Sequence, residues 1–298
     1  MKVAVGASSF AADSKKAMQL LLDQGMEVVK NPYGRKMDLK ETIRHLQGAD
    51  ALLAGLEPLN EEVFAHTPQL KAIARIGIGM DNVDTEAAAR YGIKVSNTPQ
   101  GPTDAVAEMV LAALLAIGHQ IIPADRDMHA GIWKKRMGFS MQGLKILIIG
   151  YGHIGRKVAQ MLEKFQSHLL IYDKYNPQAS NCSLEEGIQH ADVITLHAAG
   201  REEILTRELL EKIKPGTVLL NSARGGLVNE DALYEGLKNG NIRAYWGDVF
   251  WEEPYQGKIT TCENALLTPH ISTYTTACRE SMETQAVLNL LKDLGRIR

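Results

Sequence analysis

Residues 144–155 read Leu-Lys-Ile-Leu-Ile-Ile-Gly-Tyr-Gly-His-Ile-Gly, an apolar run that leads directly into a glycine-rich turn. The apolar run predicts a buried strand, and the recurrence of apolar residues over 158–165 predicts a helix after the turn. In a Gly-x-Gly-x-x-Gly turn between strand and helix, the glycines let the backbone turn tightly and approach a pyrophosphate at the positive helix end. We therefore expect a dinucleotide to bind at Gly150, Gly152, His153, Ile154 and Gly155.

The strand predicted next along the chain supports this interpretation. Residues 169–172 form an apolar run, and Asp173 follows it directly. An acid about 20 residues after the turn is the expected partner of the adenosine ribose hydroxyls. The Asp173 carboxylate would also repel a 2′-phosphate, which favours NAD over NADP, although Lys174 stands beside it. A glycine-rich turn without a ligand is the alternative, and the strand, helix and acid together argue against it.

Short strand-like runs alternate with helical patterns along most of the chain, in two sets. The expected strands are 3–5, 27–29, 51–54, 71–74 and 93–95 in the first set, and 145–149, 168–172, 193–196, 217–220, 243–246 and 265–267 in the second. Helical patterns lie near 15–24, 38–47, 60–65 and 85–91, with a long helix over 104–121 and another over 275–292. This alternation predicts an α/β fold of two doubly wound parallel-sheet domains, separated by the turn-rich residues 97–102.

Composition limits the classes of function that fit. The chain has 298 residues, 45% hydrophobic and 23% charged, with a formal net charge of −2. No basic excess exists to neutralise phosphates, so we expect no nucleic-acid or membrane partner. The three scattered cysteines suggest reduced thiols, and the polar N-terminus is unlike a signal peptide. The longest apolar stretch, 109–118, is short for a bilayer and predicts a buried helix, so we expect a cytoplasmic protein.

Three segments at the ends of later strands carry polar groups where open α/β sheets bind their ligands. These are residues 221–226, 247–254 and 268–272, and together they offer an arginine, acids and a histidine. Reduction of a 2-oxo acid needs such parts: a cation for the carboxylate and carbonyl oxygen, a proton donor, and a carboxylate that tunes the donor. No metal-ligand cluster is expected.

The chain resembles the D-isomer-specific 2-hydroxyacid dehydrogenase family nearly from end to end. Residues 75–84, Arg-Ile-Gly-Ile-Gly-Met-Asp-Asn-Val-Asp, resemble its substrate-carboxylate loop, and residues 95–99 resemble its domain crossover. The resemblance implies that Arg224 holds the substrate carboxylate and carbonyl, and that His270 gives the carbonyl oxygen its proton as hydride arrives. Glu253 would bond the other imidazole nitrogen and favour its charged form.

The resemblance also implies further contacts. NAD or NADH would touch His197, Ala198, Ser222, Ala223, Asp248 and Ser272 in addition to the glycine turn and Asp173, with Asp248 binding the nicotinamide carboxamide. The substrate would meet Arg75 and the backbone amides of Gly77, Ile78 and Gly79.

Each member of the catalytic set also has a structural interpretation. Taken alone, Arg224 could be a surface ion-pair residue and His270 a hydrogen-bonded core histidine. Glu253 could be an exposed loop acid, and its neighbour Glu252 could take its role. Their joint occurrence at strand ends, downstream of the cofactor turn, favours the catalytic interpretation. Aromatic residues near Asp248, among them Trp251, fit either packing or a pocket wall.

The identity of the substrate stays open at this level. Residues 75–108 and the stretch around Arg224 resemble phosphoglycerate dehydrogenases, whereas 270–275 resemble D-lactate dehydrogenases. Residues 53–56 stand where many phosphoglycerate dehydrogenases have an arginine for the substrate phosphate, a role that Arg35 or Arg75 could take. Phosphoglycerate dehydrogenase, hydroxypyruvate or glyoxylate reductase, and D-lactate dehydrogenase are all compatible activities, in either physiological direction.

The family architecture implies two domains and a homodimer. We expect a discontinuous, flavodoxin-like substrate domain, residues 1–98 and 271–298, and a Rossmann NAD-binding domain, residues 99–270. Residues 104–136 correspond to the family's dimer contact, with a helix buried within one chain as the alternative. An NAD(H)-sensing corepressor-like binding protein is the rival from another class, because such relatives keep the fold, the cofactor and the catalytic residues.

Overall fold

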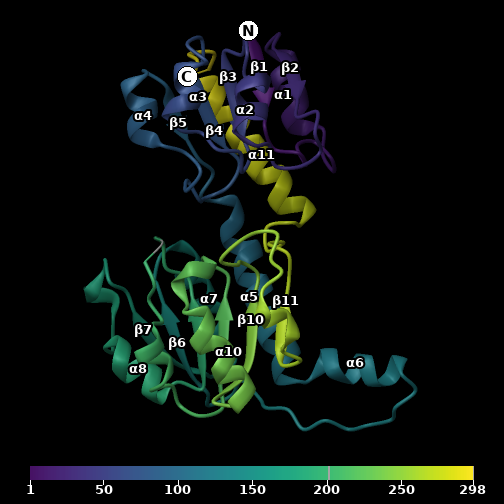
Figure 1. Ribbon diagram of the computed structural model, residues 1–298, viewed down its shortest axis with the longest axis vertical. Coiled ribbons are helices and arrows are strands. Elements are labelled where there is room, and N and C mark those ends of the chain that lie inside the picture. The colour runs from purple at the N-terminus through teal and green to yellow at the C-terminus, as the bar shows by residue number, and fades with distance from the viewer. Residues whose placement is uncertain (201, 298) are drawn as a thin grey trace. The chain divides into compact units, whose positions relative to one another are not determined.

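Two separate parallel sheets organise the chain (Figure 1). The computed structural model describes residues 1–200 and 202–297. Unit 1 comprises Met1–Pro102 and Thr273–Arg298, and unit 2 comprises Thr103–Ser272. The predicted α/β class with two doubly wound parallel sheets is confirmed. The unit borders lie within a few residues of the domain borders expected from the sequence, and the roles assigned to the two domains stay predictions.

Unit 1 contains a five-stranded sheet in the order β2-β1-β3-β4-β5, which is the flavodoxin-like order. Its strands are β1 (Lys2–Val5), β2 (Glu27–Lys30), β3 (Ala51–Ala54), β4 (Ala72–Arg75) and β5 (Lys94–Ser96). Its helices are α1 (Lys16–Asp23), α2 (Leu39–His45), α3 (Glu61–Ala65), α4 (Thr85–Arg90) and α11 (Thr276–Asp293). The last helix, α11, returns to this unit and packs against α1, β3 and β4. Because β3 and β4 pair in parallel, their carboxyl ends lie side by side.

Unit 2 contains a six-stranded sheet in the order β11-β10-β9-β8-β6-β7. Its strands are β6 (Lys145–Ile149), β7 (His168–Tyr172), β8 (Val193–Leu196), β9 (Thr217–Asn221), β10 (Ile242–Gly247) and β11 (Ala265–Leu267). Its helices are α5 (Gly101–Gly118), α6 (Ile121–His129), α7 (His153–Glu163), α8 (Leu184–His190), α9 (Arg207–Leu210) and α10 (Glu230–Asn239). The chain order reverses between β6 and β8, and ligands of such sheets bind at the carboxyl ends beside that switch.

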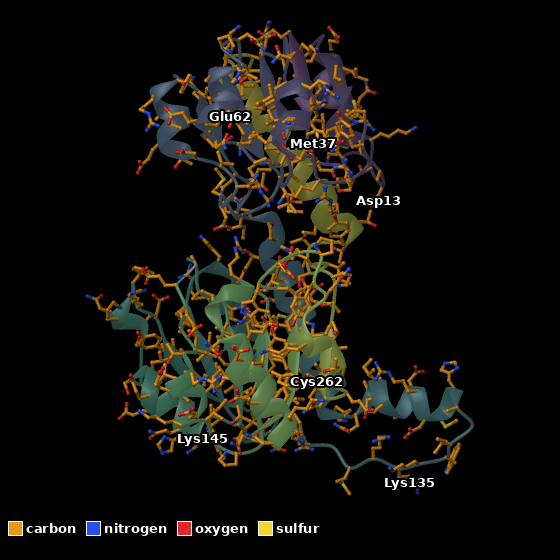
Figure 2. All side chains as sticks on the ribbon, in the orientation of Figure 1. Asp13, Met37, Glu62, Lys135, Lys145 and Cys262 are labelled. Atoms are coloured by element: carbon orange, nitrogen blue, oxygen red, sulfur yellow. The ribbon has the colours of Figure 1, made fainter. Side chains whose placement is uncertain are left out.

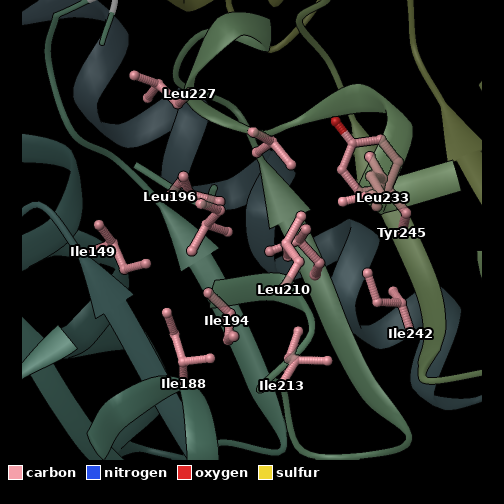
Figure 3. Close-up of a cluster of buried hydrophobic side chains, with 14 of the residues drawn as sticks. Ile149, Ile188, Ile194, Leu196, Leu210, Ile213, Leu227, Leu233, Ile242 and Tyr245 are labelled. Carbon is pink, nitrogen blue, oxygen red and sulfur yellow. The ribbon is translucent and has the colours of Figure 1, made fainter. Parts of the chain in front are cut away.

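Apolar side chains fill both faces of this sheet. On one face, residues of α8, α9 and α10, such as Ile188, Leu210 and Leu233, pack on the strands (Figure 3). On the other face, α5 and α7 contribute Leu114, Val158 and their neighbours. A sheet covered on both faces needs strands that are apolar throughout, and this is why residues 145–149 and 217–220 showed runs rather than alternation.

The long helix α5 differs in its limits from the expected 104–121. It begins at Gly101, one residue before Pro102. Proline is tolerated in the first turn of a helix, because the N–H that it lacks would have no partner within the helix. It ends at Gly118, before Gln120 takes up a left-handed backbone with φ of 56°. By length and composition alone, the 18 residues of α5 are enough to cross a membrane. Its buried side chains, including Val110 and Leu114, belong to the core of unit 2.

A projecting arm, residues 119–139, follows α5 and was not anticipated as a separate element. Helix α6 extends from the body of unit 2, and an extended segment that includes Lys135 returns beside it (Figures 1 and 2). Arg136 holds the returning segment through two bonds to Asp127, of 2.7 and 3.0 Å. The arm exposes large apolar side chains, with Trp133 80% and Met137 92% exposed. A single chain leaves this apolar surface uncovered.

Candidate active site

The glycine turn between β6 and α7 is shaped by close backbone contacts. Gly150 has φ of 94°, and a Cβ there would lie 2.5 Å from the backbone nitrogen of Ala198. A Cβ at Gly155 would lie 2.1 Å from the carbonyl oxygen of Gly150. At Gly152, the N-cap of α7, a Cβ would meet no atom within 4 Å. The turn thus presents the amino end of α7 to open space, a cradle that fits a pyrophosphate.

Asp173 follows β7 and is fixed beside the glycine turn. Its carboxylate accepts backbone N–H bonds from Tyr151 at 2.6 Å and from Tyr175 and Asn176 at 2.8 Å each. Burial opposes ionisation, but these bonds outweigh it and hold the pKa of Asp173 below its usual value. A charged carboxylate at this strand end has the geometry and sign that suit ribose hydroxyls.

His197 directly follows β8 and contacts the start of the glycine turn. Its backbone N–H donates to the carbonyl oxygen of Ile149 at 2.7 Å. Its ring nitrogens face two hydroxyls, Thr195 Oγ1 at 2.9 Å and Ser222 Oγ at 3.4 Å. The residue keeps some exposed area, but burial of the ring lowers the pKa of His197 to about 3. The imidazole is therefore neutral at physiological pH, and it connects the turn to the segment that carries Ser222 and Ala223.

His270 and Glu253 form a hydrogen-bonded pair at the carboxyl ends of β11 and β10. His270 Nδ1 lies 2.9 Å from Glu253 Oε2, with the side chains 43% and 36% exposed. Glu253 Oε1 accepts the backbone N–H of Phe250 at 3.2 Å. Burial opposes the charge of Glu253, but the bond and charge of His270 outweigh it and lower the pKa of Glu253. An ionised Glu253 occupies Nδ1 and leaves Nε2 of the imidazole for chemistry.

The backbone at His270 is itself unusual. Its φ of 56° lies in the left-handed region, which non-glycine residues rarely adopt, and its N–H donates to the carbonyl oxygen of Thr268 at 2.9 Å. Strained backbone of this kind persists only where the surroundings hold it, and it concentrates at functional sites.

Asp248 supplies that restraint. The residue is 1% exposed, and its carboxylate accepts bonds from the Thr268 hydroxyl at 2.6 Å and from the N–H groups of Ile271 and Ser272 at 2.9 and 2.8 Å. The Ser272 hydroxyl donates to it as well. These partners anchor the loop that carries His270. The carboxamide contact expected of Asp248, and the cofactor contact expected of the buried Ser272, stay predictions.

Arg224 follows β9, and its guanidinium is half-buried. One of its NH groups donates to the Ala223 carbonyl at 2.6 Å, and Asn221 Nδ2 donates to the Arg224 carbonyl at 2.9 Å. The positive charge of Arg224 contributes to the lowered pKa of Glu253. The predicted arginine, glutamate and histidine are thus gathered at neighbouring strand ends of unit 2.

In unit 1, the loop after β4 carries the predicted substrate contacts. The Gly77 N–H donates to the buried hydroxyl of Thr98 at 2.7 Å, so this expected amide is already engaged. The side chain of Asn97 donates to the Ile78 carbonyl at 2.8 Å. Within residues 1–200 and 202–297, the N–H groups of Ile78 and Gly79 make no hydrogen bond. Two adjacent N–H donors on a held loop can receive a carboxylate.

The side chain of Arg75 lies across this loop. The segment that follows β3, which includes Gly55 and Glu57, lies beside the loop, because β3 and β4 pair in parallel. The Arg75 guanidinium donates to the carbonyl of Ile76, and a Cβ at Gly77 would overlap it. Glu57, 1% exposed, accepts the Gly55 N–H at 3.0 and 3.1 Å, and burial raises the pKa of its carboxyl. Arg35 bonds both oxygens of Glu41, at 2.9 and 2.7 Å, and this pair stands at the start of α2.

Two of these residues escaped the sequence reasoning. Thr98 stood in a turn-rich stretch that resembles the domain crossover, with no role of its own, and its hydroxyl proves to hold Gly77. Glu57 carried no prediction from the sequence, and only the closely packed Gly6 and Gly55 reveal the space made for its carboxyl. The only local signal for Glu57 was an acid between a glycine and a proline, and this pattern is common in exposed loops.

Comparison with known proteins agrees with this geometry. The model of the D-isomer specific 2-hydroxyacid dehydrogenase, NAD binding domain, matches residues 111–272. The chain is 32% identical to the glyoxylate reductase of Pyrococcus furiosus, over 91% of this chain and 87% of that protein. It belongs to the D-isomer-specific 2-hydroxyacid dehydrogenases. The dehydrogenase is therefore an NAD-dependent oxidoreductase that acts on the CH–OH group of 2-hydroxy acids.

The dehydrogenase is also similar to a longer relative and to a solved structure. It is 36% identical to the D-3-phosphoglycerate dehydrogenase of Mycobacterium leprae over 79% of this chain, but spans only 47% of that longer protein. A solved structure of a protein from Thermus thermophilus superposes with a TM-score of 0.89 at 32% identity, covering 99% of this chain and 97% of that one. The family is thereby fixed, and the specific substrate is not.

Proposed function

We propose that the dehydrogenase reduces a small, unphosphorylated 2-oxo acid with NADH, using Arg224, Glu253 and His270. The observation that carries this proposal is the 2.9 Å contact between His270 Nδ1 and Glu253 Oε2. The contact lies at the carboxyl end of the sheet that also presents the glycine turn and Asp173. Bound NADH supplies the hydride.

Each of the three side chains has one task in this reduction. Arg224 pairs with the substrate carboxylate and polarises the carbonyl oxygen. His270 Nε2 gives its proton to that oxygen as the carbonyl carbon receives the hydride, and the C=O electron pair becomes the new O–H bond. Glu253 stabilises the protonated imidazole at Nδ1 and orients the ring. In the oxidation direction, the neutral imidazole takes the proton back.

The cofactor contacts follow from the same part of unit 2. Gly152, His153 and Ile154 at the amino end of α7 would hold the pyrophosphate, since this is where N–H groups point to open space. Asp173 would accept the ribose hydroxyls, and its negative charge would disfavour a 2′-phosphate. Ala198, Ser222 and Ala223 would line the rest of the site, and Asp248 would reach the carboxamide.

The substrate class follows from unit 1. The N–H groups of Ile78 and Gly79, with Arg75, would receive the carboxylate. The segment after β3 offers the buried carboxyl of Glu57, and Arg35 is already bonded to Glu41. Residues 53–56, Leu-Ala-Gly-Leu, offer no cation where many phosphoglycerate dehydrogenases have an arginine for the substrate phosphate, and this supports a substrate without a phosphate, such as glyoxylate or hydroxypyruvate.

We also infer a homodimer formed through the projecting arm. Ile132, Trp133 and Met137 are 50%, 80% and 92% exposed on the same arm, and large apolar side chains exposed together favour a protein–protein contact there. A second copy of this chain would cover them. The free thiols Cys182, Cys262 and Cys278 fit a reducing, cytoplasmic environment.

The decisive experiment is NADH consumption by the wild-type protein against a panel of 2-oxo acids. The panel holds glyoxylate, pyruvate, hydroxypyruvate, phosphohydroxypyruvate, phenylpyruvate and a branched-chain acid. We expect turnover with the small unphosphorylated acids and its loss by several orders of magnitude in His270→Ala, with NADH still bound. Highest kcat/KM for phosphohydroxypyruvate would overturn the substrate class. Tight NADH binding without turnover on any acid would favour a sensing role.

A further inference from the structure

Two segments that carry the proposed catalytic set are fastened to each other by aromatic side chains. We call residues 221–230 the Arg224 segment and residues 248–255 the Glu253 segment. Trp251 Nε1 donates to the carbonyl oxygen of Val228 at 2.8 Å. The Tyr255 hydroxyl donates to Glu230 Oε1 at 2.6 Å and accepts the backbone N–H of Ile259 at 3.2 Å. Each aromatic side chain therefore reaches from the Glu253 segment to the Arg224 segment.

The Glu253 segment is also folded back on itself. The rings of Phe250 and Tyr255 stack at 4.6 Å with their planes 13° apart, and Trp251 lies 5.8 Å from Tyr255. Because these rings bracket Glu253 in the chain, their stacking closes the turn on which Glu253 stands. The N–H of Phe250 then donates to Glu253 Oε1 at 3.2 Å, which leaves Oε2 for His270.

Backbone contact completes the connection. A Cβ at Gly225 would lie 2.0 Å from the carbonyl carbon of Phe250, so only glycine lets the two segments approach this closely. Trp251 and Tyr255 are packed against the buried cluster that contains Leu227 and Val228. Their apolar faces are thus held by the core while their polar atoms tie the segments together, an arrangement that leaves few alternative rotamers.

We propose that Trp251 and Tyr255 are positioning residues, which set Glu253 against His270 and Arg224 by fastening the two segments. This inference rests on the proposed roles of Arg224, Glu253 and His270. The polar atoms of Trp251 and Tyr255 bond Val228, Glu230 and Ile259, and none of the three proposed catalytic side chains. They act through Glu253, whose carboxylate must lie within hydrogen-bonding distance of the imidazole to be of use. Misplacement by even ~1 Å can cost orders of magnitude in rate.

The first test is Tyr255→Phe, which keeps the stacked ring and removes only the hydroxyl that reaches Glu230. We expect kcat for the preferred 2-oxo acid to fall about tenfold, with KM and the dissociation constant of NADH unchanged. The matched control is Tyr234→Phe, on α10 and packed on the same core, which should leave kcat unchanged. Equal kcat values for Tyr255→Phe and the wild type would overturn the proposal.

The second test separates positioning from general stability. In a Glu253→Gln background, Tyr255→Phe should produce little further loss, because residues that act through one group are not additive. Full additivity of the two losses would show that Tyr255 acts elsewhere and would refute the inference. Trp251→Phe, which removes the indole N–H together with the five-membered ring and keeps an aromatic ring, should repeat the pattern if Tyr255→Phe is too unstable to assay.

The outcomes also distinguish this inference from the proposed function. If Glu253→Gln and His270→Ala both retain full turnover, the proposed catalytic roles fail, whatever the aromatic variants do. If those variants lose activity while Tyr255→Phe and Trp251→Phe behave as the wild type, only the positioning inference fails.

Discussion

Replacement of Glu253 by glutamine keeps the shape of the side chain and removes its charge. Oε2 lies 2.9 Å from His270 Nδ1, and the side chains are 36% and 43% exposed. At that separation, Coulomb's law gives about 1–6 kcal/mol between the dielectric constant of water and that of a protein surface. Because both groups exceed one-third exposure, solvent screening keeps the value near the lower end, about 2 kcal/mol.

This energy sets the expected loss of activity. About 2 kcal/mol corresponds to roughly 30-fold in the stability of the protonated imidazole. We expect kcat/KM for 2-oxo acid reduction to fall by about that factor at neutral pH.

The assay is steady-state NADH oxidation from acidic to alkaline pH, with fluorescence titration of NADH as the check on folding and cofactor binding. The neighbouring Glu252→Gln is the matched control, because it makes the same change on an exposed side chain of the same loop. A Glu253→Gln enzyme with wild-type kcat/KM would refute the role of the pair.

Three further outcomes are expected. Asp173→Asn keeps the shape and removes the charge beside the ribose, so the NADPH-to-NADH ratio of kcat/KM should rise about tenfold; an unchanged ratio would reject that assignment. Burial lowers the pKa of His197 to about 3, below its unfolded value, so the unfolded state alone takes up this proton as pH falls from about 6.5 towards 3. Denaturant titrations should therefore show stability lost over that range, and His197→Asn should flatten the loss; parallel curves would contradict the buried neutral imidazole. Trp133→Glu, on the arm where this indole is 80% exposed, should give a monomeric mass by light scattering while the wild type is a dimer; two equal masses would remove the arm from the interface.

Most of the fold could be predicted from local sequence. The strands expected at 51–54, 145–149, 168–172 and 193–196 match β3, β6, β7 and β8 residue for residue. Buried parallel strands need continuous apolar runs, and the glycines and capping residues between them mark the ends of each element. The positions of the glycine turn and of Asp173 follow from that alternation, because the carboxyl ends of parallel strands meet at one edge.

The residue types of the candidate site were also available in the sequence. An arginine, an acid and a histidine each follow a predicted strand, and the chemistry of 2-oxo acid reduction needs all three. Their spacing along the chain could not say which of Glu252 and Glu253 faces His270. The structure decides for Glu253, because its Oε2 lies at hydrogen-bonding distance from Nδ1.

What only the tertiary structure decided are contacts between residues far apart in the chain. The Gly77 N–H is engaged by Thr98, Asp248 anchors the His270 loop, and Trp251 joins the Val228 carbonyl. Hydrogen bonds of this kind depend on distances of a few tenths of an ångström, which no local pattern encodes. The sequence by itself determined the two sheets and the chemistry at their edges. Packing between distant segments determined which polar atoms are already engaged and which remain for the cofactor and the substrate.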